Sequence, residues 1–363
     1  MKRKIMVVGS SLKDKGGIVT VMNNISQSDL KEKFEFIHVD TYDTCNILKK
    51  FKIYLKGLIK TIKILAKQDI DLLHVHMSYK GSFYRKSIIV LIGKMYNKPI
   101  IIHMHGSCFK DFYKRLGFLS KKYCNYVFNQ SDKVIVLSDS WKEFFEGFVK
   151  NDKVEVLNNS VAITNSQKNI IKEKKQKISF LFMGRLGERK GVYDLIEVSK
   201  RIYNNLKYRD RFELILAGDG EIDNINKVIE KEKLQDVVIN KGWISGNKKD
   251  DLLKNADVFV LPSYNEGLPM AILEAMSYHL MCISTNVGGI PEVIKHEIDG
   301  YTNNPGDNEK LYNSMINVID NEELRIKMSE NAFKNVEINF NQEKQFKKLE
   351  KIYKYLISQK VSS

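Results

Sequence analysis

The feature that most constrains the fold is a regular alternation of short apolar runs with longer segments of helical period. In the first half of the chain the apolar runs lie at Lys4 to Val8, Phe34 to Val39, Leu72 to His76, Ile100 to His105, Lys133 to Leu137 and Val154 to Leu157. Runs of this length are typical of buried strands. Strands that alternate with helices pair in parallel, so this half of the chain predicts a parallel sheet covered by helices.

The alternation stops near the middle of the chain and then starts again. Residues 162–177 are polar and have no clear period, which is typical of a linker. New apolar runs follow at Ile178 to Met183, Phe212 to Ala217, Val237 to Asn240, Val258 to Leu261 and Met281 to Ser284, and the chain from Glu309 onward is helical in pattern. We therefore predict an α/β protein with two Rossmann-like domains: an N-terminal domain over 1–165, a linker over 166–177 and a second domain over 178–341. A chain of 363 residues is long enough for each domain to bury its own core.

One stretch of the second half carries two glutamates in a strand, loop and helix pattern. The apolar run Val258 to Leu261 is followed by the loop Ser263 to Leu268, and Pro269 stands where a helix commonly has its first residue. Glu266 therefore lies in a loop at a helix N-terminus, where free N–H groups favour oxygen-rich or anionic ligands. Glu274 lies in the apolar helix that follows, and a group outside this helix must satisfy it, because an unpaired buried carboxylate is costly.

The spacing of the two glutamates argues against a glycoside hydrolase. Glu266 and Glu274 are eight positions apart, which corresponds to about 12 Å along a helix axis. The two carboxylates of a retaining hydrolase lie only about 5 to 5.5 Å apart. The two residues are therefore expected to have separate roles.

Basic and glycine-containing turns follow several of the predicted strands. Arg185 and Lys190 lie in the loop after the strand that ends at Met183, and both could reach a diphosphate, although a solvated surface loop is the alternative. Gly16 and Gly17 end the loop after the first strand and would let the backbone approach a phosphate, although such a pair is as often an ordinary turn. Neither a Gly-x-Gly-x-x-Gly fingerprint nor a P-loop occurs there, which argues against NAD and ATP.

These motifs together resemble the GT-B glycosyltransferases of family 4. The Glu-x7-Glu motif has Pro-Ser before its first glutamate and Gly267 and Leu268 directly after that glutamate, as in the signature of that family. The resemblance is specific over residues 180–295 and looser before residue 160. The resemblance implies two Rossmann-like domains that face each other across a cleft, with the last helix, residues 342–363, returning to the first domain.

The resemblance also implies roles for individual residues. Glu266 would hold hydroxyls of the donor sugar, and Glu274 the ribose of the nucleotide. Arg185 and Lys190 would neutralise the leaving diphosphate in place of a metal, and His105 would contact the donor sugar near the reacting carbon. The remaining donor-binding residues would be Gly16, Gly17, Gly218, Trp243, Gly267 and Leu268. The turns at Gly218 and Trp243 would each be ordinary if they stood alone.

Two His-x-His pairs occur in the first half. His74 and His76 share one face of a predicted strand, and so do His103 and His105. Metal ligation is an alternative for such spacing, but no acidic residue accompanies the pairs and the family needs no metal, so we predict no metal site and no cofactor. His103 is expected to be structural.

The charge of the chain is concentrated in its first half. Residues 1–176 hold 32 Lys and Arg against 16 Asp and Glu, whereas residues 177–363 hold 27 against 28. Leu48 to Lys67 has an amphipathic pattern, with Leu48, Phe51, Leu55, Leu58, Ile62 and Leu65 on one side, lysines at spacings of three and four, and no acidic residue. Such a segment is attracted to anionic lipid, although a solvated face is the alternative. Nucleic acid is not expected, because no nucleic-acid-binding module is present.

Composition indicates a protein of the reducing cytosol. The four cysteines form no Cys-x-x-Cys pair, and no uncharged apolar run approaches the roughly 18 residues of a membrane span. We expect a cytoplasmic protein, peripheral on the inner face of the cell membrane.

The sequence thus predicts a retaining glycosyltransferase. It would move a sugar from a nucleotide-diphosphate donor, expected to be a UDP-sugar, to a saccharide or polyprenyl-linked acceptor in capsular, exopolysaccharide or lipopolysaccharide biosynthesis. A nucleotide-sugar epimerase and a non-catalytic sugar-nucleotide binder are the alternatives.

Overall fold

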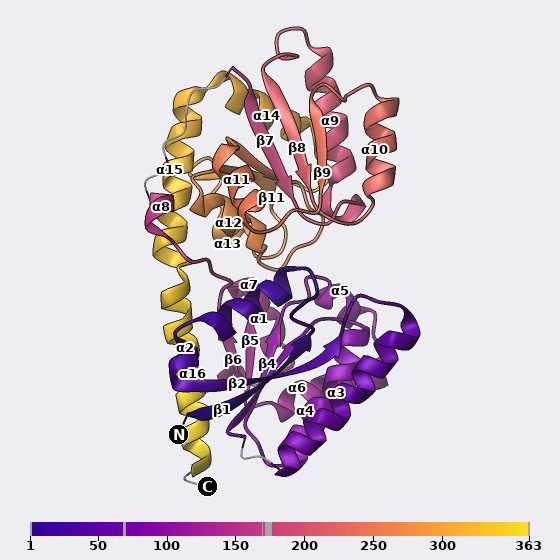
Figure 1. Cartoon of the computed structure of the whole chain (residues 1–363), viewed down its shortest axis with the longest axis vertical. Coiled ribbons are helices and arrows are strands. Elements are labelled where there is room, and N and C mark those ends of the chain that lie inside the picture. Colours follow the sequence, from indigo (N-terminus) through magenta and orange to yellow (C-terminus); the bar gives the residue numbers. More distant parts are fainter. Residues whose placement is uncertain (1, 68–69, 169, 171–175, 362–363) are drawn as a thin grey trace. The chain divides into compact units, whose positions relative to one another are not determined.

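The computed structural model describes residues 2–67, 70–168, 170 and 176–361 (Figure 1). The chain forms two compact units, one made of Met1–Asn159 with Glu343–Ser363 and the other of Ser160–Gln342. Within the predicted linker, residues 169 and 171–175 lie outside the described residues, and α8 (Asn165–Lys168) forms a single turn.

The first unit contains a six-stranded parallel sheet in the order β2-β1-β3-β4-β5-β6. Its strands are β1 (Arg3–Ser10), β2 (Phe34–Tyr42), β3 (Leu72–Met77), β4 (Ile100–Met104), β5 (Lys133–Val136) and β6 (Val154–Val156). Its helices are α1 (Gly17–Gln27), α2 (Leu30–Lys33), α3 (Ile47–Lys67), α4 (Gly81–Met95), α5 (Phe109–Lys114), α6 (Phe118–Gln130), α7 (Asp139–Glu146), the 3-10 turn η1 (Asn151–Lys153) and the C-terminal α16 (Gln342–Val361).

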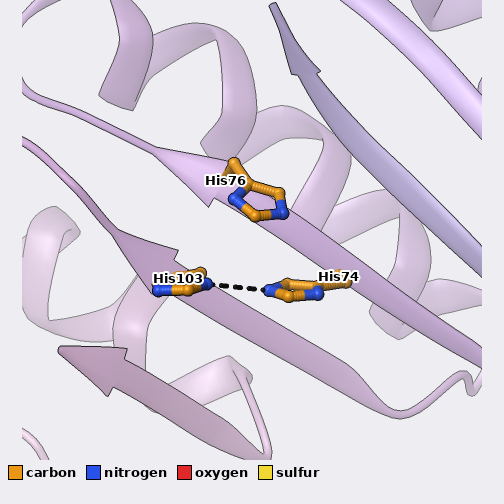
Figure 2. A group of neighbouring side chains, drawn as sticks. All are labelled: His74, His76 and His103. Carbon is orange, nitrogen blue, oxygen red and sulfur yellow. Dashed lines mark hydrogen bonds between the residues drawn. The ribbon is translucent and has the colours of Figure 1, made fainter. Parts of the chain in front are cut away.

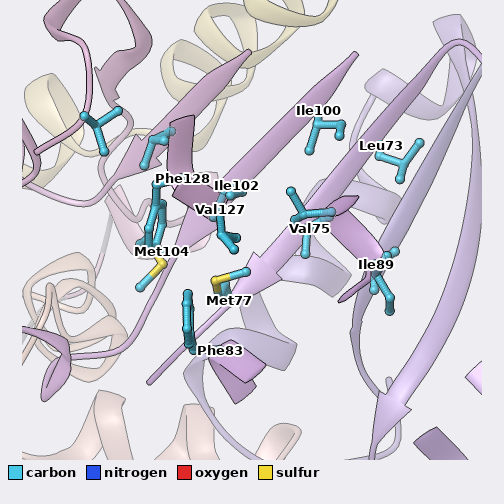
Figure 3. Close-up of a cluster of buried hydrophobic side chains, with 14 of the residues drawn as sticks. Leu73, Val75, Met77, Phe83, Ile89, Ile100, Ile102, Met104, Val127 and Phe128 are labelled. Carbon is cyan, nitrogen blue, oxygen red and sulfur yellow. The ribbon is translucent and has the colours of Figure 1, made fainter. Parts of the chain in front are cut away.

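The core of this unit lies between the central strands and the helices that cover them. Every residue of β3 and β4 is buried, which is typical of parallel strands with both faces covered. Side chains of one face pack against Phe83 of α4 and Phe128 of α6 (Figure 3). The near-continuous apolar runs of the sequence are therefore explained by two-sided burial.

The C-terminal helix α16 belongs to the first unit, as predicted. Tyr353 is fully buried and meets the ring of Phe34 edge-on at 5.3 Å. An ion pair of 2.9 Å joins Lys348 of α16 to Glu155 of β6. The first unit is thus built from two segments at opposite ends of the chain.

Helix α3 matches the predicted helix, but its apolar side is largely exposed to solvent. Leu48, Phe51 and Leu55 are 73%, 60% and 39% exposed, and of the predicted apolar side only Leu65 is buried, together with Gly57, Thr61 and Ile64. A Cβ at Gly57 would lie 2.3 Å from the carbonyl oxygen of Asp40, so close packing on β2 fixes which face turns inward. Among the described helices, none is both long enough and apolar enough to cross a membrane.

The second unit contains another six-stranded parallel sheet, in the order β12-β11-β10-β7-β8-β9. Its strands are β7 (Ile178–Met183), β8 (Phe212–Ala217), β9 (Val238–Gly242), β10 (Val258–Leu261), β11 (Met281–Thr285) and β12 (Gly300–Asn303). Its helices, besides α8, are the 3-10 turn η2 (Glu188–Lys190), α9 (Val192–Asn204), α10 (Ile222–Lys231), α11 (Asn247–Asn255), α12 (Met270–Ser277), α13 (Ile290–Val293), α14 (Asn308–Asp320) and α15 (Glu322–Asn339). Counted along the unit, the strand order is 3-2-1-4-5-6, that of a Rossmann fold.

The sequence missed one strand and displaced one helix start. Strand β12 reads Gly-Tyr-Thr-Asn and contains no apolar run, so only its pairing with β11 makes it a strand. Pro269 is the N-cap of α12, and the helix begins one residue later at Met270.

Candidate active site

The strand order places a candidate site at the carboxyl ends of the strands of the second sheet. In a 3-2-1-4-5-6 sheet the order reverses between the first and fourth strands, here β7 and β10. Ligands of such sheets bind outside the carboxyl ends of the strands at this reversal. The loops that follow β7 and β10, residues 184–191 and 262–269, are those that carry Arg185, Lys190 and Glu266.

Close backbone contacts hold these loops together. A Cβ at Gly218 would lie 1.7 Å from the carbonyl oxygen of Gly184, and one at Gly191 would lie 2.1 Å from that of Pro262. Gly191 also has a left-handed backbone with φ of 69°, which glycine adopts without strain. The amide of Tyr264 donates to the carbonyl oxygen of Arg189 at 2.9 Å, which ties the two loops together directly.

The loops bring Lys190 and Glu266 into contact. Lys190 Nζ donates to Glu266 Oε1, and the hydroxyl of Ser263 donates to the same oxygen at 2.7 Å. The side chains of Lys190 and Glu266 are only 15% and 7% exposed. Within the described residues no hydrogen bond reaches Glu266 Oε2, so one carboxylate oxygen is held in place and the other can accept hydrogen bonds from a ligand.

Arg185 has a different environment from Lys190. Its side chain is 68% exposed, and its ion pair with Asp219 measures 3.8 Å. An exposed pair at this distance contributes about 0 to 1 kcal/mol, so little energy opposes movement of the guanidinium toward a ligand.

Glu274 lies in α12 and finds its partner on a neighbouring helix. Lys249 of α11 donates to Glu274 Oε1 at 3.0 Å. The expected partner from outside the helix is therefore a lysine, and the side chain of Glu274 is 19% exposed.

The remaining predicted donor-binding residues lie on several loops. Gly218 follows β8, and Trp243, which is 44% exposed, follows β9. Gly267 accepts a hydrogen bond of 2.6 Å from the amide of Gly289, and Leu268 is buried beside it. These four residues and the two glutamates all belong to the second unit.

Gly16, Gly17 and His105 belong to the first unit. Gly16 is the N-cap of α1 with φ of 121°, and a Cβ there would have no neighbour within 4 Å. His105 follows β4 directly and is partly buried. Its Nε2 lies 2.9 Å from Nδ1 of His76.

His105 is one of four histidines that cluster on one face of β3 and β4. His74 Nε2 lies 3.2 Å from His103 Nδ1 (Figure 2). His74 Nδ1 lies 2.6 Å from the hydroxyl of Tyr353. Burial lowers the pKa of His74 and of His105 to about 3, and holds those of His76 and His103 well below the usual range. All four imidazoles are therefore neutral at pH 7.

The geometry of the cluster favours hydrogen bonds over metal ligation. Ring nitrogens of His74, His76 and His103 lie within 4.8 Å of one another. However, the ring planes of His74 and His103 are nearly parallel, at 6°, and their facing nitrogens lie 3.2 Å apart, within hydrogen-bonding distance of each other. Ligands of one zinc ion, each about 2.0 to 2.1 Å from it, would instead point their lone pairs at a common centre.

Sequence reasoning missed two residues that complete the site. Ser263 orients Glu266, and its presence in the Pro-Ser pair before the loop was the available signal. Lys249 pairs with Glu274 from a helix 25 positions earlier, and no local pattern reveals that contact.

The chain was compared with known proteins. A model described as Glycosyltransferase Family 4 matches residues 6–164, and one described as Glycosyl transferases group 1 matches residues 163–335. A relative in Escherichia coli, the UDP-Gal:alpha-D-GlcNAc-diphosphoundecaprenol alpha-1,3-galactosyltransferase, is 29% identical over 314 residues, which are 82% of this chain and 79% of the relative.

Solved structures share the fold. Sucrose-phosphate synthase from Thermosynechococcus elongatus has a TM-score of 0.81 at 16% identity, over 98% of this chain and 100% of that one. The Anabaena protein HepE in complex with UDP-glucose has a TM-score of 0.73 at 16% identity, over 99% of both chains.

The two parallel-sheet units and these neighbours define the GT-B fold. The two family models together span residues 6–335. The chain belongs to the group 1 glycosyl transferases, with a family 4 N-terminal half.

Proposed function

We propose that the chain is a retaining glycosyltransferase that uses a UDP-sugar and extends a saccharide carried on a polyprenyl diphosphate. The observation that carries the proposal is the group formed by Lys190, Glu266 and Ser263 at the strand-order reversal of the second sheet. The Escherichia coli relative is named for a UDP-sugar and a saccharide on diphosphoundecaprenol, which supports the choice of donor and acceptor. The pathway would be the synthesis of a cell-envelope polysaccharide such as a capsule.

The donor sugar would be held by Glu266. Its Oε2 can accept hydrogen bonds from sugar hydroxyls, while Ser263 and Lys190 keep Oε1 in position. His105 from the first unit would contact the sugar near the reacting carbon, with Gly16 and Gly17 supplying backbone beside the phosphates.

The leaving diphosphate would be stabilised by Lys190 and Arg185. Donors aimed at charge that develops in the transition state act strongly in a water-poor site. Lys190 is already desolvated, and it would exchange part of its contact with Glu266 for the phosphate oxygens. We propose that these two cations replace a divalent metal.

The nucleotide would be bound by Glu274 and Trp243. A carboxylate accepts two hydroxyl groups well, which suits the ribose, and the ion pair with Lys249 orients Glu274. The backbone near Trp243 would meet the base, and Gly218, Gly267 and Leu268 would line the site.

The first unit would bind the inner face of the cell membrane through α3. Its exposed face combines lysines with apolar residues such as Leu48 and Phe51. A helix of this composition binds anionic membrane both by charge and by burying apolar side chains in the interface. Such binding would bring the cytoplasmic enzyme to a lipid-linked acceptor.

A donor experiment tests the proposed function against its alternatives. The protein is incubated with a panel of UDP-sugars, first alone and then with a GlcNAc-diphospholipid acceptor, and products are analysed by mass spectrometry and by NMR of the anomeric centre. We expect transfer that requires acceptor and yields an α-linkage from an α-donor. Conversion of the donor without acceptor would indicate an epimerase, and binding without any turnover would indicate a silent binder.

A further inference from the structure

Lys86 of α4 is a buried lysine that has no carboxylate partner among the described residues. Its side chain is 2% exposed, and its Nζ donates to the hydroxyl of Ser82 at 3.1 Å. No ion pair of Lys86 with an acidic residue occurs in the described ranges. A buried charge without a counter-charge is costly, so the site lacks a group that would stabilise the ammonium.

The position of Lys86 within its helix increases this cost. Side chains of a helix point back toward its N-terminus, and the bond to Ser82 places the ammonium near the start of α4. Helix N-termini carry a partial positive charge and free N–H groups, which disfavour cations and favour anions. Lys86 therefore adds positive charge where the helix already carries it.

The neighbours of Lys86 are cationic or neutral. Arg85 precedes it, its Nε is buried without a hydrogen-bond partner in the described part of the chain, and its guanidinium lies 5.0 Å from the ring centre of Tyr42. The other groups that interact electrostatically with Lys86 are the neutral imidazoles of His76 and His105. Desolvation, followed by the charge of Arg85, lowers the pKa of Lys86 to about 7.

The group lies where an α/β sheet binds ligands. The first sheet has the order 2-1-3-4-5 with β6 added, and this order reverses between β1 and β3. α4 follows β3, and the hydroxyl of Ser82 accepts from the amide of Ser78 just beyond the carboxyl end of that strand. Gly81, the first residue of α4, is exposed, so the helix start is open to solvent.

We propose that Ser82, Arg85 and Lys86, with the first-turn amides of Gly81 and Phe83, form an anion site that takes the diphosphate of the acceptor. The inference rests on the proposed function, because the lipid-linked acceptor supplies the diphosphate. A diphosphate carries enough negative charge to neutralise both adjacent cations, and its oxygens can accept from the ammonium, the guanidinium and the backbone amides together. The acceptor would thus be bound by its charged group in the first unit, apart from the donor diphosphate.

Calorimetry of the full chain with inorganic pyrophosphate tests the site. The protein is first saturated with UDP, so that the donor site is occupied. We expect wild type to bind pyrophosphate under these conditions, and Lys86→Met to bind it about 30-fold more weakly or worse, the cost of removing one partner of a buried charge pair. Lys94→Met, which changes an exposed lysine in the last turn of the same helix, should behave as wild type.

Thermal unfolding provides a second readout that a purely structural lysine would not give. Without anion, Lys86→Met should be at least as stable as wild type, because an apolar side chain of similar length replaces a buried unpaired cation. Pyrophosphate should raise the Tm of wild type and leave that of Lys86→Met unchanged. If Lys86→Met does not fold, the 13Cε shift of Lys86 in wild type still reports the site, since a bound anion raises the pKa of the ammonium.

Different ligands distinguish a diphosphate of the acceptor from the diphosphate of the donor. Farnesyl diphosphate should bind the UDP-saturated wild type, and farnesol should not. The proposal would be overturned by equal pyrophosphate affinity in wild type and Lys86→Met. It would also be overturned if pyrophosphate left the 13Cε shift of Lys86 in wild type unchanged. Displacement of pyrophosphate by UDP would also overturn it, because the anion would then be the donor's. These measurements need no turnover, so a failure of the transferase assay would refute the proposed function alone.

Discussion

The contact between Lys190 and Glu266 would matter both in the free enzyme and during departure of the diphosphate. In the described structure the lysine neutralises a buried carboxylate, and the carboxylate in turn keeps the lysine extended toward the loop. A diphosphate near this pair would compete with Glu266 for the ammonium. Charge that moves onto the leaving group during the reaction would strengthen the new contact, which is the differential stabilisation that catalysis requires.

Replacing Lys190 or Arg185 by alanine should reduce turnover without loss of fold. We expect kcat to fall by about 100-fold or more for each, comparable to the loss of one oxyanion donor. Activity should persist in chelator, because in our proposal the two cations take the place of a metal. Complete loss of activity in chelator, restored by magnesium or manganese, would contradict this assignment. Lys227→Ala, on the exposed face of α10, serves as the control for the two alanine variants.

The two glutamates should separate binding of the nucleotide from turnover. Glu274→Ala should weaken UDP by roughly 10- to 100-fold, since hydrogen bonds to a charged group contribute about 1.5 to 3 kcal/mol. Glu266→Ala should leave UDP affinity nearly unchanged and lower kcat. Calorimetry with UDP and steady-state kinetics measure the two effects, with Glu230→Ala of α10 as the control, and the reverse pattern would show that the roles are exchanged.

The histidine cluster predicts a definite set of tautomers. Nε2 of His76 and Nε2 of His103 are buried without partners in the described residues, and a buried lone pair is tolerated better than a buried N–H. Both rings should therefore carry the proton on Nδ1. His76 would then donate to Nε2 of His105, which leaves His105 with an Nδ1–H to offer a ligand.

Nitrogen-15 NMR of labelled histidines measures these tautomers directly. We expect an Nδ1–H pattern for His105 in wild type and a mixture in His76→Phe, where the donor is lost. His76→Asn, whose amide can occupy the place of Nδ1, should restore the wild-type pattern and a wild-type KM for the donor. An Nε2–H pattern for His105 in wild type would refute the prediction.

At the scale of elements, what the sequence could predict depended on local pattern. Two-sided burial makes β7 and β10 plain apolar runs, so their positions and the loops that follow them could be predicted. β12 has no such run, and only the neighbouring strand defines it. The apolar side of α3 was identified, but its orientation was not, because packing of Gly57 on β2 is a long-range contact. The hydrogen bond between Lys249 and Glu274 is also a contact between separate elements, so the sequence could not predict it.

The exposed face of α3 should bind anionic membrane in two ways. Changing Lys49, Lys52, Lys56 and Lys63 to glutamine should reduce co-sedimentation with anionic vesicles, by roughly 1 kcal/mol for each lysine near the surface. Changing Leu48 and Phe51 to serine should weaken binding that remains at 1 M salt, where the screening length is about 3 Å. As a control, changing Lys227, Lys231, Lys233 and Lys248 of the second unit to glutamine should alter neither the co-sedimentation with anionic vesicles nor the binding that remains at 1 M salt.

If all these variants sediment equally, or if the protein binds neutral vesicles independently of the salt concentration, α3 is excluded as a membrane contact. The transferase assignment would be unaffected, because none of the residues proposed to bind the donor lies in α3.

At the scale of the whole molecule, the buried histidines predict unequal acid stability of the two units. The pKa of each is lower in the folded state than the unfolded value near 6.5, and for His74 and His105 it is about 3. Between pH 6.5 and 3 the unfolded first unit therefore binds more protons than the folded one. Its stability is fully present above pH 6.5 and falls below it, by up to about 1.4 kcal/mol per pH unit for each histidine.

Urea unfolding followed by tryptophan fluorescence at pH 7 and pH 5 checks this prediction. Trp141 is buried in the first unit, so the variant Trp243→Phe reports that unit alone. We expect a lower midpoint at pH 5 for Trp141 and a smaller change for Trp243 in the reciprocal variant. His296→Asn, at an exposed position of the second unit, should leave both midpoints unchanged.

The composition of the first unit from Met1–Asn159 and Glu343–Ser363 has a consequence for synthesis on the ribosome. Strand β3 and its His74 emerge early, but Tyr353, which closes the hydrogen bond to that histidine and fills the adjacent core, is made almost 280 residues later. The second unit is complete once Gln342 has emerged, whereas the nascent first unit must wait for the last helix with part of its core uncovered. The half of the enzyme that is translated first is therefore the half that finishes folding last, and in the interval it depends on whatever shields exposed apolar surface in the cell.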